Sequence, residues 1–222
     1  MEHASSTPSA CAGSPVDNRV ASADTRATAT QGSTTTPRVA LVTGAGKRLG
    51  RAIALALAQD GWDIGVHCRD SVAEAKQTVE EIRALGRRAV VLQADLDDAA
   101  QCQTLVPRLA DALGPVSGLI NSASRFEYDD IRSFTPESLQ QHLVPNLMAP
   151  LLLAQALASQ LPAATVQGVI VNLLDQKLFN LNPDFLSYTL SKAALSAATT
   201  MLAQALAPRM RVVGVAPGLT LP

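Results

Sequence analysis

The chain has 222 residues, of which 47% are hydrophobic, and a formal net charge of −1 at pH 7. This is enough for one globular domain with a buried core, and the near-neutral charge argues against a nucleic-acid-binding protein. The three cysteines and three histidines have no metal-type spacing. We therefore expect no metal site, no disulfide framework and a reducing, cytoplasmic location.

Residues 1–36 are dominated by Ser, Thr, Ala, Gly and Pro. Such a segment has little apolar surface to bury, so we predict a disordered tail. It lacks the continuous apolar segment of a secretory signal. Arg19 and Arg26 lie among Ser and Thr and leave a transit peptide as an alternative, although the acidic residues of the tail count against it. The domain is predicted over residues 37–222.

From Arg38 onwards, apolar segments of strand length alternate with segments of helical periodicity. Strands are predicted over Arg38–Val42, Trp62–Cys68, Arg88–Gln93, Val116–Asn121, Gly168–Leu174 and Arg211–Val215. Helices are predicted over Arg51–Ala58, Ser71–Leu85, Ala99–Leu113, a long segment opened by Thr135 and Pro136, and Phe185–Leu206. Strands separated by helices pair in parallel through right-handed crossovers, so we predict a single α/β domain with a doubly wound, Rossmann-like parallel sheet.

One long segment, Ser138–Leu174, contains no Asp, Glu, Lys or Arg. Asn146, Pro150 and Pro162 interrupt it, together with two glutamines. This pattern favours a buried core helix followed by a central strand over a membrane span. We expect no membrane partner.

A glycine-rich turn, Gly44–Gly50, connects the first strand to the first helix. The first turn of a helix has unpaired N–H groups and partial positive charge, which together bind phosphate. Gly44 allows a sharp turn and Gly50 a close approach of helix and strand, while Lys47 and Arg48 add positive charge. A simple helix-entry loop is the alternative, and the flanking strand and helix favour the phosphate site.

Polar residues gather where the predicted strands end, which is where ligands bind in such sheets. These ends are Cys68-Arg69, Ala94-Asp95-Leu96, Asn121-Ser122-Ala123-Ser124 and Asn172-Leu173-Leu174-Asp175. An acid at the end of the second strand usually accepts from the ribose hydroxyls of NAD. Arg69 in this region favours a 2′-phosphate instead, and hence NADP, with a solvated surface arginine as the alternative.

Tyr188 and Lys192 lie four residues apart in a predicted helix and therefore on one face of it. A lysine cation close to a phenol lowers the phenol pKa, which would make Tyr188 a usable acid near neutral pH. A surface pair on the helix is the alternative interpretation. The position of the pair, between Asp175 and Pro217-Gly218, favours catalysis.

With these residues in view, the chain from Val39 to its end resembles the short-chain dehydrogenase/reductase family, and within it the pteridine reductases. Most of the family has glycine where this chain has Arg48, and serine where it has Asp175. Pteridine reductases have Arg and Asp there, and they stack the pterin ring on an aromatic residue at the position of Phe126. Asn146 matches the catalytic asparagine of the family, which holds a water in a proton relay to Lys192.

The resemblance implies an enzyme that transfers hydride from NADPH to a dihydropterin or dihydrofolate. It implies the catalytic residues Asn146, Asp175, Tyr188 and Lys192, and substrate contacts from Arg48, Phe126, Asp175 and Tyr188. It places the cofactor against Gly44, Lys47, Arg48, Leu49, Gly50, Arg69, Asp95, Leu96, Asn121, Ala123, Ser124, Tyr188, Lys192, Pro217 and Gly218, with Asp95 accepting from the adenine amino group.

The family usually continues beyond Pro217-Gly218 through a substrate-covering segment, another helix and a seventh strand. We therefore expect a fold without the last helix and strand. The resemblance also implies a homo-oligomer, either a tetramer or a dimer. Two other functions remain open: a general carbonyl reductase, for example of 3-oxoacyl thioesters, and a nucleotide-binding module without catalysis. Asp175 counts against the first, and the intact Asn146, Tyr188 and Lys192 against the second.

Overall fold

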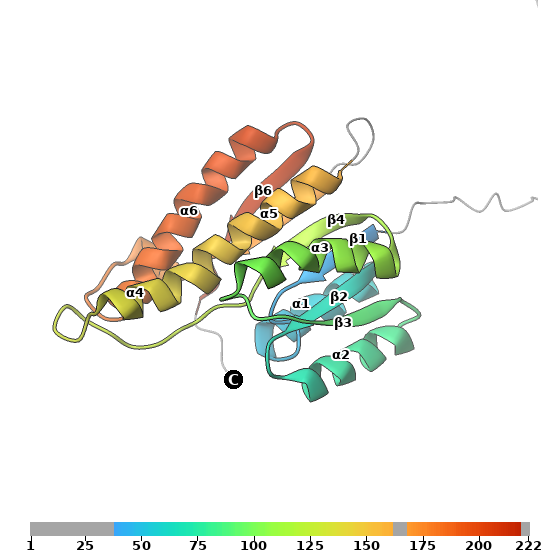
Figure 1. Ribbon diagram of the computed structural model, residues 1–222, viewed down its shortest axis with the longest axis horizontal. Helices are drawn as coiled ribbons and strands as arrows, with labels where there is room; N and C mark the ends of the chain where they lie inside the picture. The colour runs from blue at the N-terminus through green and yellow to red at the C-terminus, as the bar shows by residue number, and fades with distance from the viewer. Residues whose placement is uncertain (1–37, 162–167, 219–222) are drawn as a thin grey trace, which may run out of the picture. The chain divides into compact units, whose positions relative to one another are not determined.

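The computed structural model describes residues 38–161 and 168–218 (Figure 1). The predicted disordered tail, residues 1–36, lies outside the described residues. The strands are β1 (Arg38–Val42), β2 (Trp62–Cys68), β3 (Ala89–Gln93), β4 (Val116–Asn121), β5 (Gly168–Leu173) and β6 (Met210–Val215). The helical elements are α1 (Arg48–Gln59), α2 (Val72–Ala84), α3 (Ala99–Leu113), α4 (Pro136–Leu143), the π-helical η1 (Val144–Met148), α5 (Ala149–Gln160), the 3₁₀ helix η2 (Gln176–Phe179) and α6 (Leu186–Leu206).

The strands form one parallel sheet in the order β3-β2-β1-β4-β5-β6. The order reverses between β1 and β4, which confirms the predicted doubly wound topology and places a ligand-binding crevice at their carboxyl ends. The predicted strand bounds agree with the structure to within one residue. Helix α1 begins at Arg48, three residues earlier than predicted, because Gly50 lets its first turn pack directly on the glycine-rich loop.

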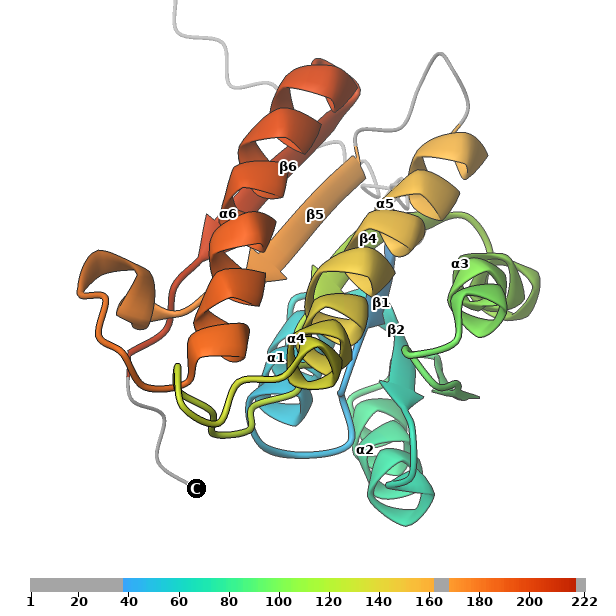
Figure 2. The ribbon, with the colours of Figure 1, turned by 60° about the vertical axis from the view of Figure 1, so that its left-hand side comes forward.

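Helices cover both faces of the sheet and create two apolar cores (Figure 2). Side chains alternate along a strand, so Val39 and Leu41 of β1 enter the core under α3 and α5, whereas Ala40 and Val42 enter the core under α1 and α2. All four are fully buried. A sheet buried on both faces explains why its strands are continuous apolar runs.

The α4, η1 and α5 elements form one helical run along the sheet. Thr135 caps its start in a reciprocal hydrogen-bond pair with Ser138, and Pro136 occupies the first turn. Residues Pro136–Gln160 are long and apolar enough to cross a membrane. Leu153 and Leu157 are fully buried in the core with α3, as expected for the core helix of a globular domain.

The face under α1 and α2 is covered unevenly. Over β4, β5 and β6 the described residues leave an apolar hollow of about 600 Å³. Its walls include Ile53 and Leu57 of α1, Val171 of β5, and Val215 and Pro217 at the end of β6. Arg38 and Val169 line it at the amino ends of their strands and Leu173 at a carboxyl end, and the hollow contains few polar groups.

The opposite, amino-terminal edge of the sheet contains a buried carboxylate that tests the packing energetics. Asp63 of β2 accepts from the backbone and side chain of Arg88 and pairs with Arg87 at 2.6 Å. Breaking a buried, hydrogen-bonded ion pair leaves uncompensated charge.

We expect Asp63→Asn to lower the free energy of unfolding by about 2–3 kcal/mol, measured by urea denaturation. Asp60→Asn, which alters an exposed pair with Arg38, should cost less than about 1 kcal/mol, and equal losses would contradict this account.

Candidate active site

The glycine-rich loop is tightly packed where it enters α1. Gly44 adopts a left-handed φ of +65°, and a Cβ added at Gly50 would lie 2.2 Å from the Gly44 carbonyl oxygen. Arg48 also has a positive φ, of 48°. A non-glycine residue in this region is strained, which is typical of functional loops.

The start of α1 presents backbone donors and positive charge. Its N-cap residue, Lys47, makes no side-chain cap, and the first turn contains no acidic residue. Arg48 is exposed, and Lys47 forms an ion pair of 2.7 Å with Glu74 of α2. The loop therefore has the backbone geometry, the uncapped N–H groups and the charge that a phosphate requires.

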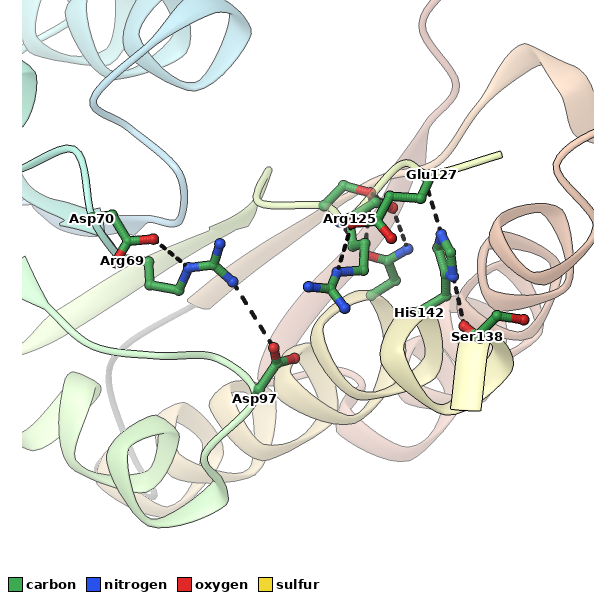
Figure 3. Close-up of polar contacts among 9 residues, drawn as sticks. Arg69, Asp70, Asp97, Arg125, Glu127, Ser138 and His142 are labelled. Carbon is green, nitrogen blue, oxygen red and sulfur yellow. Dashed lines mark hydrogen bonds and ion pairs between the residues drawn. The ribbon is translucent and has the colours of Figure 1, made fainter. Parts of the chain in front are cut away.

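The predicted 2′-phosphate site contains acidic partners that the sequence analysis did not pair with Arg69. Arg69 lies between Asp70, at 2.8 Å, and Asp97, at 3.9 Å (Figure 3). The hydrogen bond to Asp70 raises the pKa of Arg69. The Arg69 side chain is about half exposed, so a phosphate could replace these carboxylates as its partner.

On the loop after β3, the Asp95 carboxylate accepts from the backbone N–H of Asp97 at 3.0 Å and so closes its own turn. Leu96 is only 7% exposed and belongs to the core. Contact between Leu96 and a cofactor is therefore confined to its backbone.

The loop after β4 is fastened to the glycine-rich loop by a buried hydroxyl. Thr43 Oγ1 accepts from the N–H groups of Ser122 and Ala123 at 2.9 and 3.0 Å. Asn121 donates to Asn172 of β5 at 2.7 Å, and its own Oδ1 is buried with no partner among the described residues. Ser124 donates to Asn146 at 3.2 Å. The sequence analysis did not assign Thr43 a role, although it directly precedes Gly44.

The structure brings Asp175, Tyr188 and Lys192 together at the end of β5. The Tyr188 hydroxyl donates to Asp175 Oδ2 at 2.6 Å. The other carboxylate oxygen accepts from the Lys177 backbone and caps η2. Lys192 Nζ donates to the Leu173 carbonyl at 2.8 Å and lies 5.8 Å from the centre of the Tyr188 ring. Asp175 thus serves as helix cap and tyrosine partner at once.

The pKa of Tyr188 is shifted in the direction opposite to the one we predicted. Burial, followed by the hydrogen bond to Asp175 and its negative charge, raises the pKa of Tyr188. Burial lowers the pKa of Lys192 to about 8, although the charge of Asp175 opposes this shift. We predicted that Lys192 would lower the pKa of Tyr188, and in the structure burial, followed by the contact with Asp175, raises it instead. Tyr188 is therefore held in its protonated form.

Asn146, in the π-helical turn η1, clamps the loop that follows β4. Its Oδ1 accepts from the Arg125 backbone N–H at 2.8 Å, and its Nδ2 donates to the Arg125 carbonyl at 3.0 Å. Nδ2 also donates to Ser191 at 2.9 Å, which connects the clamp to α6. Ser191 was missed by sequence reasoning, and its place one residue before Lys192 is the only signal that could have suggested it.

The clamped loop presents Phe126 beside Tyr188. Phe126 is 58% exposed, so its side chain does not anchor the loop by being buried. Its ring makes an edge contact with Tyr188 at 4.6 Å and stacks on Phe185 at 4.4 Å. His142 accepts from the Glu127 N–H and donates to the Ser138 carbonyl, which holds the next residue of the loop (Figure 3). An exposed aromatic face thus lies next to the Tyr188 hydroxyl.

Pro217 and Gly218 lie at the end of the described chain. The Pro217 carbonyl accepts from the backbone N–H of Gln176 at 3.1 Å. Gly218 lies near the Gln176 side chain. Both residues are therefore adjacent to Asp175 through η2. The site as a whole combines an anion-binding loop, a protonated tyrosine, a buried lysine and an aromatic surface, an arrangement suited to reduction with a dinucleotide.

The comparisons with known proteins agree with this geometry. The family model described as short chain dehydrogenase matches residues 38–222. A crystal structure of FolM alternative dihydrofolate reductase 1 from Brucella suis in complex with NADP is 41% identical, with a TM-score of 0.79, over 83% of this chain and 76% of that chain.

Two curated relatives have lower identity. An uncharacterized oxidoreductase of Methylorubrum extorquens is 37% identical over 82% of this chain and 72% of its own length. The 2-dehydro-3-deoxy-D-gluconate 5-dehydrogenase of Dickeya dadantii is 32% identical over 82% of this chain and 71% of its own length. The names of the relatives thus include more than one type of substrate.

The hydrogen bond between Tyr188 and Asp175 can be tested by titration, because the chain has only two tyrosines. In Tyr128→Phe, the remaining Tyr188 should form tyrosinate only together with alkaline unfolding. A pKa raised in the folded state contributes stability below the unfolded-state pKa of about 10, which is lost as the pH rises further. Adding Asp175→Asn should lower the pH at which tyrosinate absorbance appears. An unchanged titration would show that Asp175 does not control this group.

Proposed function

Because the chain belongs to the short chain dehydrogenase family, we propose that it is an NADPH-dependent reductase of a pterin-type substrate, a dihydropterin or dihydrofolate. The observation that carries the proposal is the hydrogen bond from Tyr188 to Asp175. A carboxylate at this place can receive the N–H and amino donors of a pterin ring, which a simple alcohol or ketone lacks. The similarity to an NADP-bound alternative dihydrofolate reductase supports it.

The residues present fit NADP(H). The uncapped start of α1 and the exposed Arg48 suit the pyrophosphate, and the close contact of Gly50 with Gly44 keeps side chains away from it. Arg69 suits a 2′-phosphate. When bound, NADPH supplies the hydride at its nicotinamide ring.

The protein's own contribution to the chemistry is the proton. Burial and the hydrogen bond to Asp175 keep Tyr188 protonated, and Asp175 directs its hydroxyl toward the end of β5. Lys192 is held by the Leu173 carbonyl, with its ammonium near the Tyr188 ring, where positive charge stabilises the phenolate as the proton leaves. We assign Tyr188 as the acid, Asp175 as its partner and substrate acceptor, and Lys192 as the stabilising charge.

Asn146 acts in this scheme by fixing the loop that carries Phe126. It binds both the N–H and the carbonyl of Arg125, so the backbone just before Phe126 has no freedom to rotate. One face of the Phe126 ring packs on Phe185, and more than half of its surface stays exposed beside Tyr188. A flat bicyclic ring can stack on this surface.

A general carbonyl reductase is the second candidate. The relative that is a 2-dehydro-3-deoxy-D-gluconate 5-dehydrogenase favours it, as does the presence of Tyr188 and Lys192 on one helix face. Asp175 distinguishes the two candidates, because a carbonyl substrate offers no N–H group from which the Asp175 carboxylate could accept a hydrogen bond. Substrate preference therefore tests the proposal directly.

The first test measures NADPH oxidation with dihydrobiopterin, dihydrofolate and an acetoacetyl thioester in parallel, with NADPH binding followed separately by fluorescence. We expect turnover of the pterins and none of the thioester. Asp175→Ala should lose at least about 100-fold in kcat while the Kd for NADPH stays within about twofold. Turnover of the thioester alone would establish the carbonyl reductase, and binding without any turnover would indicate a nucleotide-binding module.

Phe126→Ala tests the stacking surface. The exposed ring contributes apolar and aromatic contact to a flat substrate, and its loss should raise the KM for the pterin about tenfold. The Kd for NADPH should change much less. Tyr128→Ala is a matched control, because it also removes an aromatic ring, and Tyr128 is similarly exposed on the same loop but contacts Phe185 and not Tyr188. An equal effect of both variants on KM would contradict a specific role for Phe126.

A further inference from the structure

A buried histidine lies among the loops that follow β1, β2 and β3. His67 of β2 is 2% exposed. Its Nδ1 is 3.1 Å from the Gly44 N–H, which donates to it, and its Nε2 is 3.2 Å from the Ala94 carbonyl oxygen. A carbonyl can only accept, so Nε2 carries the proton and Nδ1 the lone pair. The two backbone partners therefore select one neutral tautomer.

The imidazole joins two loops that are far apart in the sequence. Gly44 begins the phosphate-binding loop, and Ala94 directly precedes Asp95 on the loop after β3. Two backbone hydrogen bonds link the same segments. The Ala45 N–H donates to the His67 carbonyl at 2.9 Å, and the Ala94 N–H donates to the Cys68 carbonyl at 3.1 Å. The end of β2 thus fixes the spacing between these loops by both backbone and side chain.

We propose that His67 is a positioning residue for the dinucleotide: its neutral ring sets the distance and the angle between the loop that receives the pyrophosphate and the loop that borders the adenine. This inference rests on the proposed use of NADPH. The ring has a specific task at the left-handed turn of Gly44, because it is the acceptor for the Gly44 N–H. The start of α1 has no side-chain cap, which leaves its N–H groups for a phosphate.

The positioning role requires an uncharged ring. An imidazolium has donors on both nitrogens and cannot accept from the Gly44 N–H. Burial lowers the pKa of His67 to about 4; Arg108 of α3 also lowers it, whereas Asp95 and the Ala94 carbonyl raise it. His67 thus keeps its acceptor throughout the neutral pH range.

The experiment compares the Kd for NADPH, by fluorescence titration at pH 7.5, in His67→Leu and His67→Gln. Leucine removes both hydrogen bonds and leaves the Gly44 N–H unpaired, and we expect binding about tenfold weaker. Glutamine carries an acceptor and a donor in one side chain, so we expect it to restore most of the affinity. The KM for the pterin at saturating NADPH should not change in either variant.

Asp63→Asn is the matched control, because Asp63 lies on the same strand at the opposite edge of the sheet. It should lower stability and leave the Kd for NADPH unchanged. Wild-type affinity in His67→Leu, or an equal loss of affinity in Asp63→Asn, would overturn the positioning role. Failure of the wild-type chain to bind NADPH would instead overturn the proposed function.

A measurement on the unaltered chain covers the case in which His67→Leu fails to fold. Nitrogen-15 NMR of the three histidines should show, for His67, a proton on Nε2, an unprotonated Nδ1 and no titration between pH 8 and about 5.5. A proton on Nδ1, or titration near the ordinary pKa of about 6.5, would overturn the proposal regardless of the variants.

Discussion

The hydroxyl of Thr43 connects the two halves of the sheet at the point where the strand order reverses. It accepts from two successive N–H groups of the loop after β4 and donates to the Ile120 carbonyl at 3.3 Å. The Thr43 backbone N–H donates to the same carbonyl at 3.0 Å. A crevice between β1 and β4 can hold a ligand only if the two loops that border it keep a fixed separation. This buried residue provides that constraint, and the glycine-rich loop follows directly from it.

On the other side of the crevice, the loop that carries Phe126 is ordered by an alternation of fixed and free positions. Arg125, Glu127 and Asp129 are held by side chains or backbone groups from η1, α4 and α6. Between them, Phe126 and Tyr128 are 58% and 60% exposed. These three contacts hold the backbone on both sides of each exposed aromatic ring, and Asp129 is itself buried.

The fold was largely predictable because it depends on local patterns: apolar runs of strand length, helix caps such as Thr135, and the alternation of strand and helix. The set of residues at the strand ends was predictable from topology and from the family resemblance. Their pairing was not. Asp175 and Tyr188 are 13 residues apart and Lys192 and Leu173 are 19 apart, and no periodicity in the sequence indicates which neighbour of a phenol is nearest. The predicted lowering of the Tyr188 pKa by Lys192 was wrong because burial, and then the contact with Asp175, raises that pKa instead.

The same limit applies to Arg69: Asp70 follows it directly in the chain, but its second acidic partner, Asp97, becomes apparent only when the loops after β2 and β3 are side by side. The predicted phosphate contact then implies an exchange of partners, and affinity depends on the difference between two charge-assisted interactions. Both carboxylates are at least partly exposed, so releasing them into water costs little. A dinucleotide phosphate with several oxygens can therefore compete for Arg69.

At the end of β5, the Asp175 carboxylate makes two hydrogen bonds that a serine in its place could not make together. One oxygen is used by the N–H of Lys177 at the start of η2, and the other by Tyr188. A serine hydroxyl has a single oxygen on a shorter side chain and could not make both contacts from the same backbone position. The first bond fixes the orientation of the carboxylate, so the second oxygen points at the tyrosine without a search among rotamers. The cap at the start of η2 thus orients the carboxylate that accepts from Tyr188.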